Sequence, residues 1–406
     1  MMNFRNTFYA LLCLASLSLS AQNPYTDNIT SILESSEQQH KARIAFGLVR
    51  LSDGKTLCEY RSRERFVPAS IVKVLSTGAL MLERGRHYRY PTEIYTVGQI
   101  QSGQLQGALL IRGSGDPSLG TELIEGERYR FTNELLRALQ ERGIREITGG
   151  IYLDASLATG VGPVDSWAKE DLDKAYGTGL YGLNYADNQV GGRAEHNPAQ
   201  TLAAAIETRL RFAGITIGKA PTVSYEGYEP EGSLLHTYYS QPLEVLAKVT
   251  NHRSMNMYAE AIAQRLNPNL DRGIALSNYW RKQLGLSAQD ISLADGSGLS
   301  RDNQVNAYAL SKALVKLFGG HLPEDGTLVA TLPRLGAEGT IRNLMPETRV
   351  KGYLKSGSMR GVATYIGYVH YGDDWYAIVY LTNGMPSARQ ARGVFAAIID
   401  DLFPQA

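Results

Sequence analysis

The chain has 406 residues, of which 43% are hydrophobic and 20% are charged. This length and composition are enough for a large buried core and for more than one domain. Because 41 basic residues almost balance 40 acidic residues, the overall charge does not favour a nucleic-acid partner, and none is expected.

The first 21 residues are predicted to be a secretory signal peptide. Arg5 supplies a positive charge, Tyr9–Leu19 forms an apolar run, and the small residues Ser20–Ala21 precede Gln22, as at a cleavage site. The alternative is a membrane anchor, but the apolar run is short for crossing a bilayer. We therefore expect no stable membrane insertion, and the sequence predicts a periplasmic protein cleaved near residue 21.

A helix and a hairpin are predicted to follow the leader. Asp27–His40 has amphipathic spacing, and Arg43–Leu51 and Thr56–Arg61 alternate as two strands. Asp53–Gly54 between the strands is a strong hairpin signal, and the order of elements is typical of an α+β fold. Signal cleavage would leave Cys58 as the only cysteine, so we expect it to pack in its strand without forming an intramolecular disulfide.

The stretch Pro68–Lys73 (Pro-Ala-Ser-Ile-Val-Lys) opens a strongly periodic helix. Ser70 lies in its first turn, and Lys73 lies one turn further on the same side. The helix dipole favours an anionic serine oxygen, and a lysine whose pKa is lowered can take the serine proton. The alternative is an ordinary helix-start serine. Ser-x-x-Lys also occurs at Ser52 and Ser166, but these lie in a turn and an irregular stretch.

Residues 89–231 are predicted to form an inserted domain, because short strands there alternate with Gly-rich turns. Its elements are expected at Glu93–Val97, Gln106–Arg112 and Glu146–Leu153 as strands, and at Thr132–Arg142 and Pro198–Ala213 as helices. Gly113–Pro117 lacks the Lys-Ser/Thr of a phosphate loop and is predicted to be a tight turn. Trp167–Asn188 is rich in Tyr, Gly and Asn, and we expect it to shape a cleft wall.

Residues 232–406 are predicted to complete one catalytic domain with residues 22–88. Helices are expected at Leu243–Val249, Met255–Leu266, Ile274–Gln283, Ala307–Leu317 and Ala388–Leu402, with a break at Asn251–Arg253. Strands are expected at Val350–Lys355, Val362–Tyr371 and Trp375–Thr382. The first and last hairpins of the chain would then share one antiparallel sheet.

Two further motifs lie in this last segment. Ser254–Asn256 is the only Ser-x-Asn in the chain; its hydroxyl could relay a proton, and the Asn256 amide could bond a peptide group. Lys355–Gly357 is the only Lys-Ser/Thr-Gly; its cation and hydroxyl could hold a carboxylate, and Gly357 would let an extended peptide approach. Either motif alone is more often structural, but the three together favour an acyl-transfer site.

The triple motif resembles that of penicillin-binding proteins and class A β-lactamases. The wider sequence resembles the D-alanyl-D-alanine carboxypeptidase/endopeptidase family S13, the class C low-molecular-mass penicillin-binding proteins. The stretches that carry the resemblance are Pro68–Lys73, Gly115–Pro117, Asn251–Glu260, Asp295–Arg301 and Lys355–Ser358. Two residues depart from the pattern: Met255 replaces an acidic or polar residue, and Ser356 replaces the commoner threonine but keeps the hydroxyl.

The resemblance implies an α+β penicillin-binding-protein/β-lactamase-like transpeptidase fold, in which helices flank an antiparallel sheet. It also implies an inserted domain between the first and second motifs. The stretch of sequence between Ser70 and Ser254 has far more residues than a plain β-lactamase needs, and fewer than in the larger members of the family.

The implied reaction cleaves D-Ala-D-Ala termini, or D-Ala-diaminopimelate cross-links, of peptidoglycan stem peptides through a Ser70 acyl-enzyme. In this reaction Lys73 is the base, Ser254 passes the proton toward the leaving amine, and Asn256 orients the peptide. β-Lactams are expected to be covalent inhibitors, because they present an acyl carbonyl and a carboxylate at similar geometry.

The resemblance also implies the remaining site residues. Lys355, Ser356 and Gly357 would hold the terminal carboxylate and the substrate, and the backbone N–H groups of Ser70 and Ser358 would form the oxyanion hole. No cofactor is expected. A metal is not expected either, because the seven histidines are scattered and show no His-x-x-x-His helix pattern.

Two alternatives remain: a β-lactamase, which would share the acylation step, and a non-catalytic protein on the same scaffold. A β-lactamase would deacylate quickly, often through a glutamate in a Glu-x-x-Leu-Asn loop, but Leu183–Asn184 is preceded by Leu-Tyr-Gly. A non-catalytic wall-binding or sensor protein on this scaffold would not need the intact reactive residues, namely Ser70, Lys73, Ser254, Asn256 and Lys355.

Overall fold

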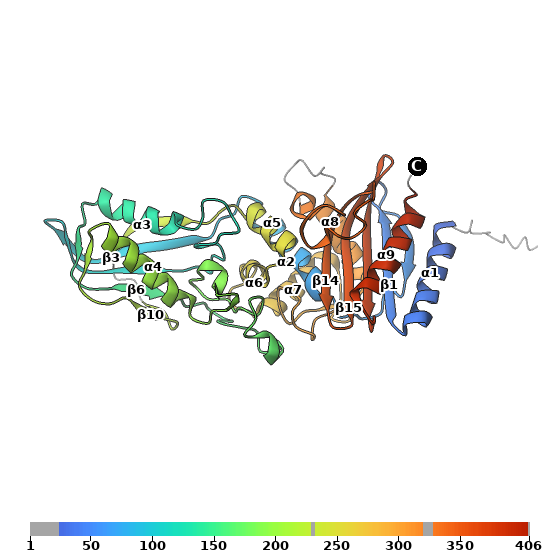
Figure 1. Cartoon of the computed structure of the whole chain (residues 1–406), viewed down its shortest axis with the longest axis horizontal. Coiled ribbons are helices and arrows are strands. Elements are labelled where there is room, and N and C mark those ends of the chain that lie inside the picture. Colours follow the sequence, from blue (N-terminus) through green and yellow to red (C-terminus); the bar gives the residue numbers. More distant parts are fainter. Residues whose placement is uncertain (1–23, 229–231, 320–327, 405–406) are drawn as a thin grey trace, which may run out of the picture.

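The structure is a computed structural model that describes residues 24–228, 232–319 and 328–404. Figure 1 shows an elongated molecule with one sheet at each end. Helices α5 (Leu243–Arg253) and α6 (Asn256–Gln264) lie between the two sheets. Within the described part, the first helix and the last helix lie at the same end of the molecule (Figure 1).

The first sheet joins the beginning of the chain to its end. Its strands, in spatial order, are β14 (Lys351–Met359), β15 (Val362–Tyr371), β16 (Asp374–Asn383), β1 (Arg43–Arg50) and β2 (Thr56–Tyr60). All neighbours are antiparallel. β1 pairs with β16 from Arg43 opposite Asn383 to Arg50 opposite Tyr376, which places the first and last hairpins in one sheet, as predicted.

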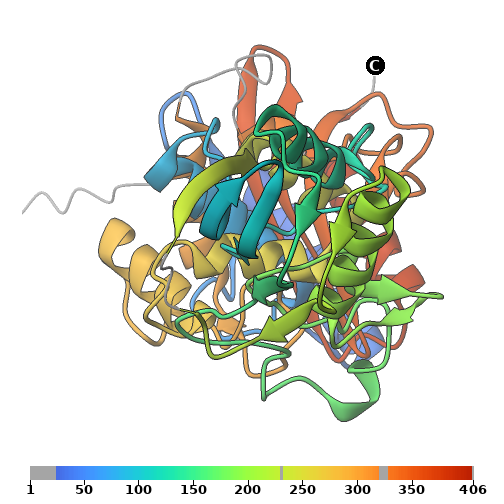
Figure 2. The ribbon, with the colours of Figure 1, turned by 90° about the vertical axis from the view of Figure 1, so that its left-hand side faces the viewer.

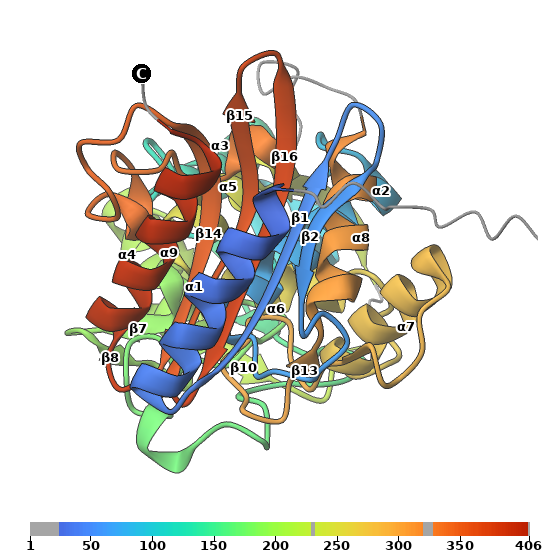
Figure 3. The same ribbon diagram turned by 90° about the vertical axis from the view of Figure 1, so that its right-hand side faces the viewer.

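Helices cover both faces of the first sheet. Figure 3 shows α1 (Pro24–His40) and α9 (Ala388–Leu402) on one face, and the other face packs against α2 (Val72–Arg84), α7 (Arg272–Leu284) and α8 (Ala307–Phe318). Successive residues of the inner strand β1 belong to the two cores: Ala45 lies in the core that contains Leu75, and Phe46 lies in the core that contains Phe395. Because both faces are covered, β1 is apolar along most of its length.

The second sheet mixes parallel and antiparallel pairs. Its main strands, in spatial order, are β10 (Thr222–Ser224), β6 (Ile151–Asp154), β4 (Gln104–Arg112), β3 (Pro91–Gln101) and β11 (Ser233–Tyr239). β5 (Glu146–Ile147) pairs with β4, and β9 (Thr216–Ile217) pairs with β5. Helices α3 (Arg130–Glu141) and α4 (Pro198–Phe212) share its core through residues such as Leu135 and Ile206. Figure 2 turns this region toward the viewer.

The remaining short strands form two small pairs. They are β7 (Gln189–Val190) with β8 (Arg193–Ala194), and β12 (Ile291–Ser292) with β13 (Gln304–Val305). Three-residue 3-10 turns also occur, and the turns at Ala69–Ile71 (η1) and Gly339–Ile341 (η6) border the site described below.

Several predicted boundaries differ from the structure. β11 pairs with β3, so the second sheet extends to Tyr239, past the expected boundary at residue 231. The predicted strand Glu146–Leu153 is two strands, β5 and β6, with Thr148–Gly150 between them. The break expected at Asn251–Arg253 is wrong: α5 continues to Arg253 and ends at Ser254, which has a left-handed conformation. The buried Asn251 donates from Nδ2 to Thr331 Oγ1 at 3.0 Å.

Two expectations concern the leader and the cysteine. The predicted signal peptide lies outside the described residues. In the part of the chain that the structure describes, no helix has the length and apolar character needed to cross a membrane. Cys58 is buried in β2, and burial raises the pKa of its thiol to about 11, which suits a packing residue rather than a reactive one.

Candidate active site

Ser70 lies in η1, the 3-10 turn that leads into α2. Strand β14 crosses directly over this turn at Gly357. A Cβ atom at Gly357 would lie 2.8 Å from the Pro68 carbonyl oxygen and 2.9 Å from the Ser70 nitrogen, closer than real contacts allow. Gly357 was expected to let a substrate peptide approach; in the structure it allows η1 to pack against β14.

Lys73 is fully buried one turn beyond Ser70. Its Nζ donates to Ser70 Oγ at 3.0 Å, to Asn256 Oδ1 at 2.6 Å and to the Ser297 carbonyl oxygen at 2.7 Å. Burial lowers the pKa of Lys73 to about 7, although the negative charges of Asp295 and Glu260 oppose this shift. A large part of Lys73 is therefore neutral near pH 7, and a neutral amine beside a serine hydroxyl can accept its proton.

Two buried carboxylates hold the loop that carries Ser297. Asp295 accepts the backbone N–H of Gly298 at 2.7 Å, and Glu260 Oε2 accepts that of Gly296 at 3.0 Å. Burial raises the pKa of Glu260. The Asp295–Arg301 segment was recognised in the sequence without a role. In the structure it supplies the carbonyl that bonds Lys73.

Ser254 and Asn256 reach the site from the junction of α5 and α6. Ser254 ends α5 in the left-handed conformation, with φ 58° and ψ 40°, and its Oγ accepts from Lys355 Nζ at 3.1 Å. The amide of Asn256 accepts from Lys73 and donates from Nδ2 to the Tyr176 carbonyl oxygen at 2.7 Å. Tyr176 belongs to the stretch expected to shape a cleft wall, and the structure places it against the site.

Lys355 is the second fully buried lysine of the site. Besides its contact with Ser254, its Nζ donates to the Ser356 carbonyl oxygen at 2.5 Å. Burial and the positive charge of Lys73 lower the pKa of Lys355 well below its ordinary value. An anion bound nearby would favour the protonated lysine. Protonated Lys355 and a bound carboxylate would therefore stabilise each other.

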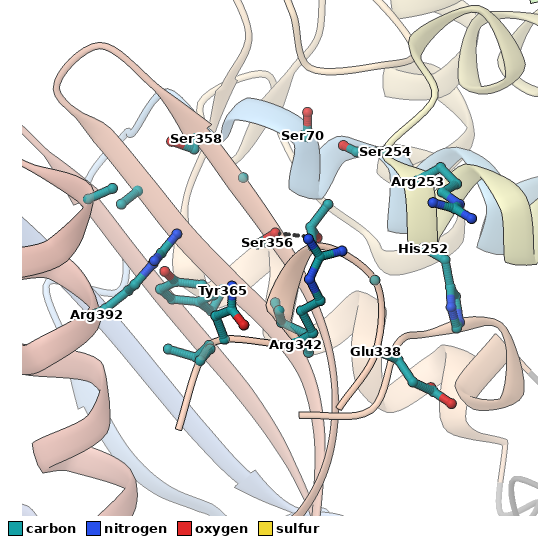
Figure 4. A pocket seen from close by; sticks show the side chains of 18 of the residues that line it. Ser70, His252, Arg253, Ser254, Glu338, Arg342, Ser356, Ser358, Tyr365 and Arg392 are labelled. Atoms are coloured by element: carbon teal, nitrogen blue, oxygen red, sulfur yellow. Dashed lines mark hydrogen bonds between the residues drawn. The ribbon is translucent and has the colours of Figure 1, made fainter. Parts of the chain in front are cut away.

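Ser356 and Ser358 lie on β14, and the Lys355–Gly357 motif lies inside this strand rather than at its end, because β14 continues to Met359. The hydroxyl of Ser356 is hydrogen-bonded to that of Thr340 at 2.7 Å. Ser358 lines the same cavity as Ser70, and Figure 4 shows both side chains at its edge.

The cavity has a volume of about 860 Å³ and is lined by Ser70, Ser254, Ser356 and Ser358. Among the described residues, no group of three or more His, Cys, Asp or Glu side chains is placed to hold a metal ion. Gly357 also lines this cavity. The other predicted site residues lie behind its wall: Lys73 is hydrogen-bonded to Ser70, Asn256 to Lys73, and Lys355 to Ser254. Sequence reasoning missed the roles of Tyr176, Ser297 and Thr340, which act through backbone carbonyls or a lone hydroxyl and leave no motif.

Most of the chain matches a known protein family. The profile of the D-Ala-D-Ala carboxypeptidase 3 (S13) family matches residues 25–196 and 186–400. Carboxypeptidase DacB of Mycolicibacterium smegmatis is 26% identical over 420 residues, which cover 94% of this chain and 86% of the relative.

Solved structures show the same fold. Penicillin binding protein 4 (dacB) of Haemophilus influenzae matches with a TM-score of 0.76 and 22% identity, over 90% of this chain and 99% of that one. Its complex with a β-lactam gives a TM-score of 0.72 at 21% identity, over 93% and 100% of the two chains. A predatory endopeptidase of Bdellovibrio bacteriovorus gives 0.60 at 17% identity, over 88% and 92%.

These structural matches confirm the predicted fold class, in which helices flank the antiparallel sheet of a penicillin-binding protein. The family profile covers most of the chain, including all three motifs. The chain therefore belongs to the D-Ala-D-Ala carboxypeptidase 3 (S13) family, as its motifs predicted.

Proposed function

We propose that this protein is an exported serine D,D-carboxypeptidase/D,D-endopeptidase. It would cleave D-Ala-D-Ala termini or D-Ala-diaminopimelate cross-links of peptidoglycan through an acyl-enzyme on Ser70. The observation that carries the proposal is the buried Lys73, whose Nζ lies 3.0 Å from Ser70 Oγ and whose pKa is lowered to about 7. Such a pair supplies a nucleophile and its base.

Acylation would begin when neutral Lys73 takes the proton of Ser70 as Oγ attacks the carbonyl carbon of the penultimate D-Ala. The backbone N–H groups of Ser70 and Ser358 would stabilise the oxyanion. When the C–N bond breaks, Ser254 would pass the proton held by Lys73 on to the leaving amine, which returns Lys73 to its neutral form; Lys355 Nζ lies 3.1 Å from Ser254 Oγ. Water would then hydrolyse the ester and release Ser70.

Substrate binding is proposed to use the β14 side of the cavity. Lys355 and Ser356 would hold the carboxylate of the leaving D-amino acid, because an anion compensates the cost of keeping Lys355 charged in a buried position. Asn256 would orient the peptide. β-Lactams would use the same anchor and acylate Ser70, and the β-lactam complex of the H. influenzae relative supports this expectation.

Export to the periplasm is part of the proposal, and it is motivated by Arg5 and the apolar run Tyr9–Leu19. The β-lactamase alternative has less support. The segment before Leu183–Asn184 lacks the glutamate of a deacylating loop, and Asn184 is buried, with its Nδ2 donating to the carbonyl oxygens of Asp116 and Tyr181.

The test is mass spectrometry of purified muropeptides after incubation with the mature protein. Release of D-alanine from pentapeptides, or of monomers from cross-linked dimers, would support the proposal if Ser70→Ala abolishes it. Unchanged muropeptides in the presence of folded protein would contradict it and would favour a non-catalytic wall-binding or sensor role.

A further inference from the structure

The active-site cavity continues well beyond the position proposed for the leaving D-amino acid. Its volume of about 860 Å³ lies in the upper part of the ~300–1,000 Å³ range that proteins use for drug-sized ligands. One alanine would fill only a small part of it. The remainder extends past Ser356 toward η6 and the end of α5, both of which line the cavity.

The η6 turn forms the far wall of this extension. It packs against both β14 and α5. A Cβ atom on Gly339 would lie 2.8 Å from the His252 carbonyl oxygen, so the turn meets the last residues of α5 closely. On its other side, Thr340 Oγ1 is hydrogen-bonded to Ser356 Oγ at 2.7 Å. The wall is thus attached to the residue that would anchor the leaving carboxylate.

The charged side chains that line the cavity are mostly cationic. They are Lys248, Arg253, Arg342 and Arg392, against the single carboxylate Glu338. Within the described part of the chain, none of these four cations forms an ion pair. A concave surface with several uncompensated cations attracts anionic ligands.

Two of the cations lie next to the proposed leaving-group position. Arg253 immediately precedes Ser254, and Arg342 is two residues beyond Thr340. Figure 4 shows Arg342 beside Ser356 and Arg253 beside Ser254. Arginine remains charged at all relevant pH values and can bind a carboxylate with two parallel hydrogen bonds.

We propose that this cationic extension of the cavity binds the leaving peptide strand of a cross-linked substrate, through carboxylates beyond the one at the scissile bond. Arg342 and Arg253 are its main contacts. The inference rests on the proposed function and makes it more specific. A departing D-alanine carries one carboxylate, which Lys355 and Ser356 would hold, whereas a departing stem peptide carries several and spans the extension. The site is therefore built to accept endopeptidase substrates.

The experiment compares kcat/KM for a cross-linked muropeptide dimer with kcat/KM for a monomeric pentapeptide. Arg342→Gln and Arg253→Gln should each lower the dimer-to-pentapeptide ratio about tenfold, because each loses a charged hydrogen bond to the leaving strand alone. Arg142→Gln is the matched control: Arg142 is exposed at the end of α3 and does not line the cavity. With the wild type, the ratio should also fall as ionic strength rises.

Equal losses on both substrates, or no loss on either, would overturn the assignment of Arg342 and Arg253. A wild-type ratio that does not respond to salt would also count against it. Failure of the proposed function would look different, because the wild type itself would then cleave neither substrate. Labelling of each variant by fluorescent penicillin checks that the nucleophile remains correctly folded.

Discussion

The acylation rate of Ser70 should depend on pH with a midpoint near 7. Only the neutral amine of Lys73 can accept the serine proton, and burial lowers its pKa from 10.5 to about 7. At pH 7 an ordinary lysine is neutral in about one molecule in 3,000, whereas Lys73 is neutral in about half. Burial therefore increases the fraction of Lys73 that is neutral at pH 7 about a thousandfold.

The assay is the second-order rate of labelling by fluorescent penicillin between about pH 5 and pH 9. Because protonation removes the base, the rate should fall about tenfold per pH unit below about pH 6 and should level off above about pH 8. Glu260→Gln removes a negative charge that raises the pKa of Lys73, so its midpoint should move to lower pH.

Lys73→Arg is the matched control, because it keeps a positive charge that cannot be lost in this pH range. Its labelling should be slower by orders of magnitude and should lack the pH dependence near 7. The reasoning would be refuted by a wild-type rate that is constant across the range, or by a midpoint near the ordinary lysine value.

Three other predictions test separate parts of the account. Release of D-alanine should survive EDTA, because a serine–lysine pair needs no metal; activity that is lost and then restored by zinc would contradict this mechanism. Expression of the full chain should yield a secreted protein cleaved near Ala21, and N-terminal sequencing that finds Met1 would contradict export. Phe395 is fully buried, with its ring 4.7 Å from that of Tyr365, so Phe395→Ala should lower the free energy of unfolding by about 3–5 kcal/mol; a denaturant titration that shows a loss below about 1 kcal/mol would be inconsistent with this packing.

The sequence was most informative where chemistry and local pattern coincide. The periodic helix after Ser70 predicted that Lys73 would lie beside it, because residues three apart share one face of a helix. The hairpin at Asp53–Gly54 and the alternating C-terminal strands likewise predicted the first sheet. These elements depend on local spacing, which a single sequence displays directly.

The sequence was least informative where segments far apart meet. The contact of Tyr176 with Asn256 joins residues 80 positions apart, and it uses a backbone carbonyl that any residue could supply. The local pattern did not reveal that β11 pairs with β3, because strand propensity does not indicate which strand a segment will pair with. The lowered pKa of Lys355 likewise depends on burial and on Lys73, which only the assembled fold provides.

Identification of the residue that a β-lactam acylates tests the central claim most directly. Penicillin-treated protein would be digested and its peptides analysed by mass spectrometry, with gel labelling of the folded variants in parallel. The account predicts an adduct on the peptide that contains Ser70, no labelling of Ser70→Ala, and normal labelling of Ser52→Ala and Ser166→Ala. Labelling of Ser70→Ala at the wild-type rate would contradict it.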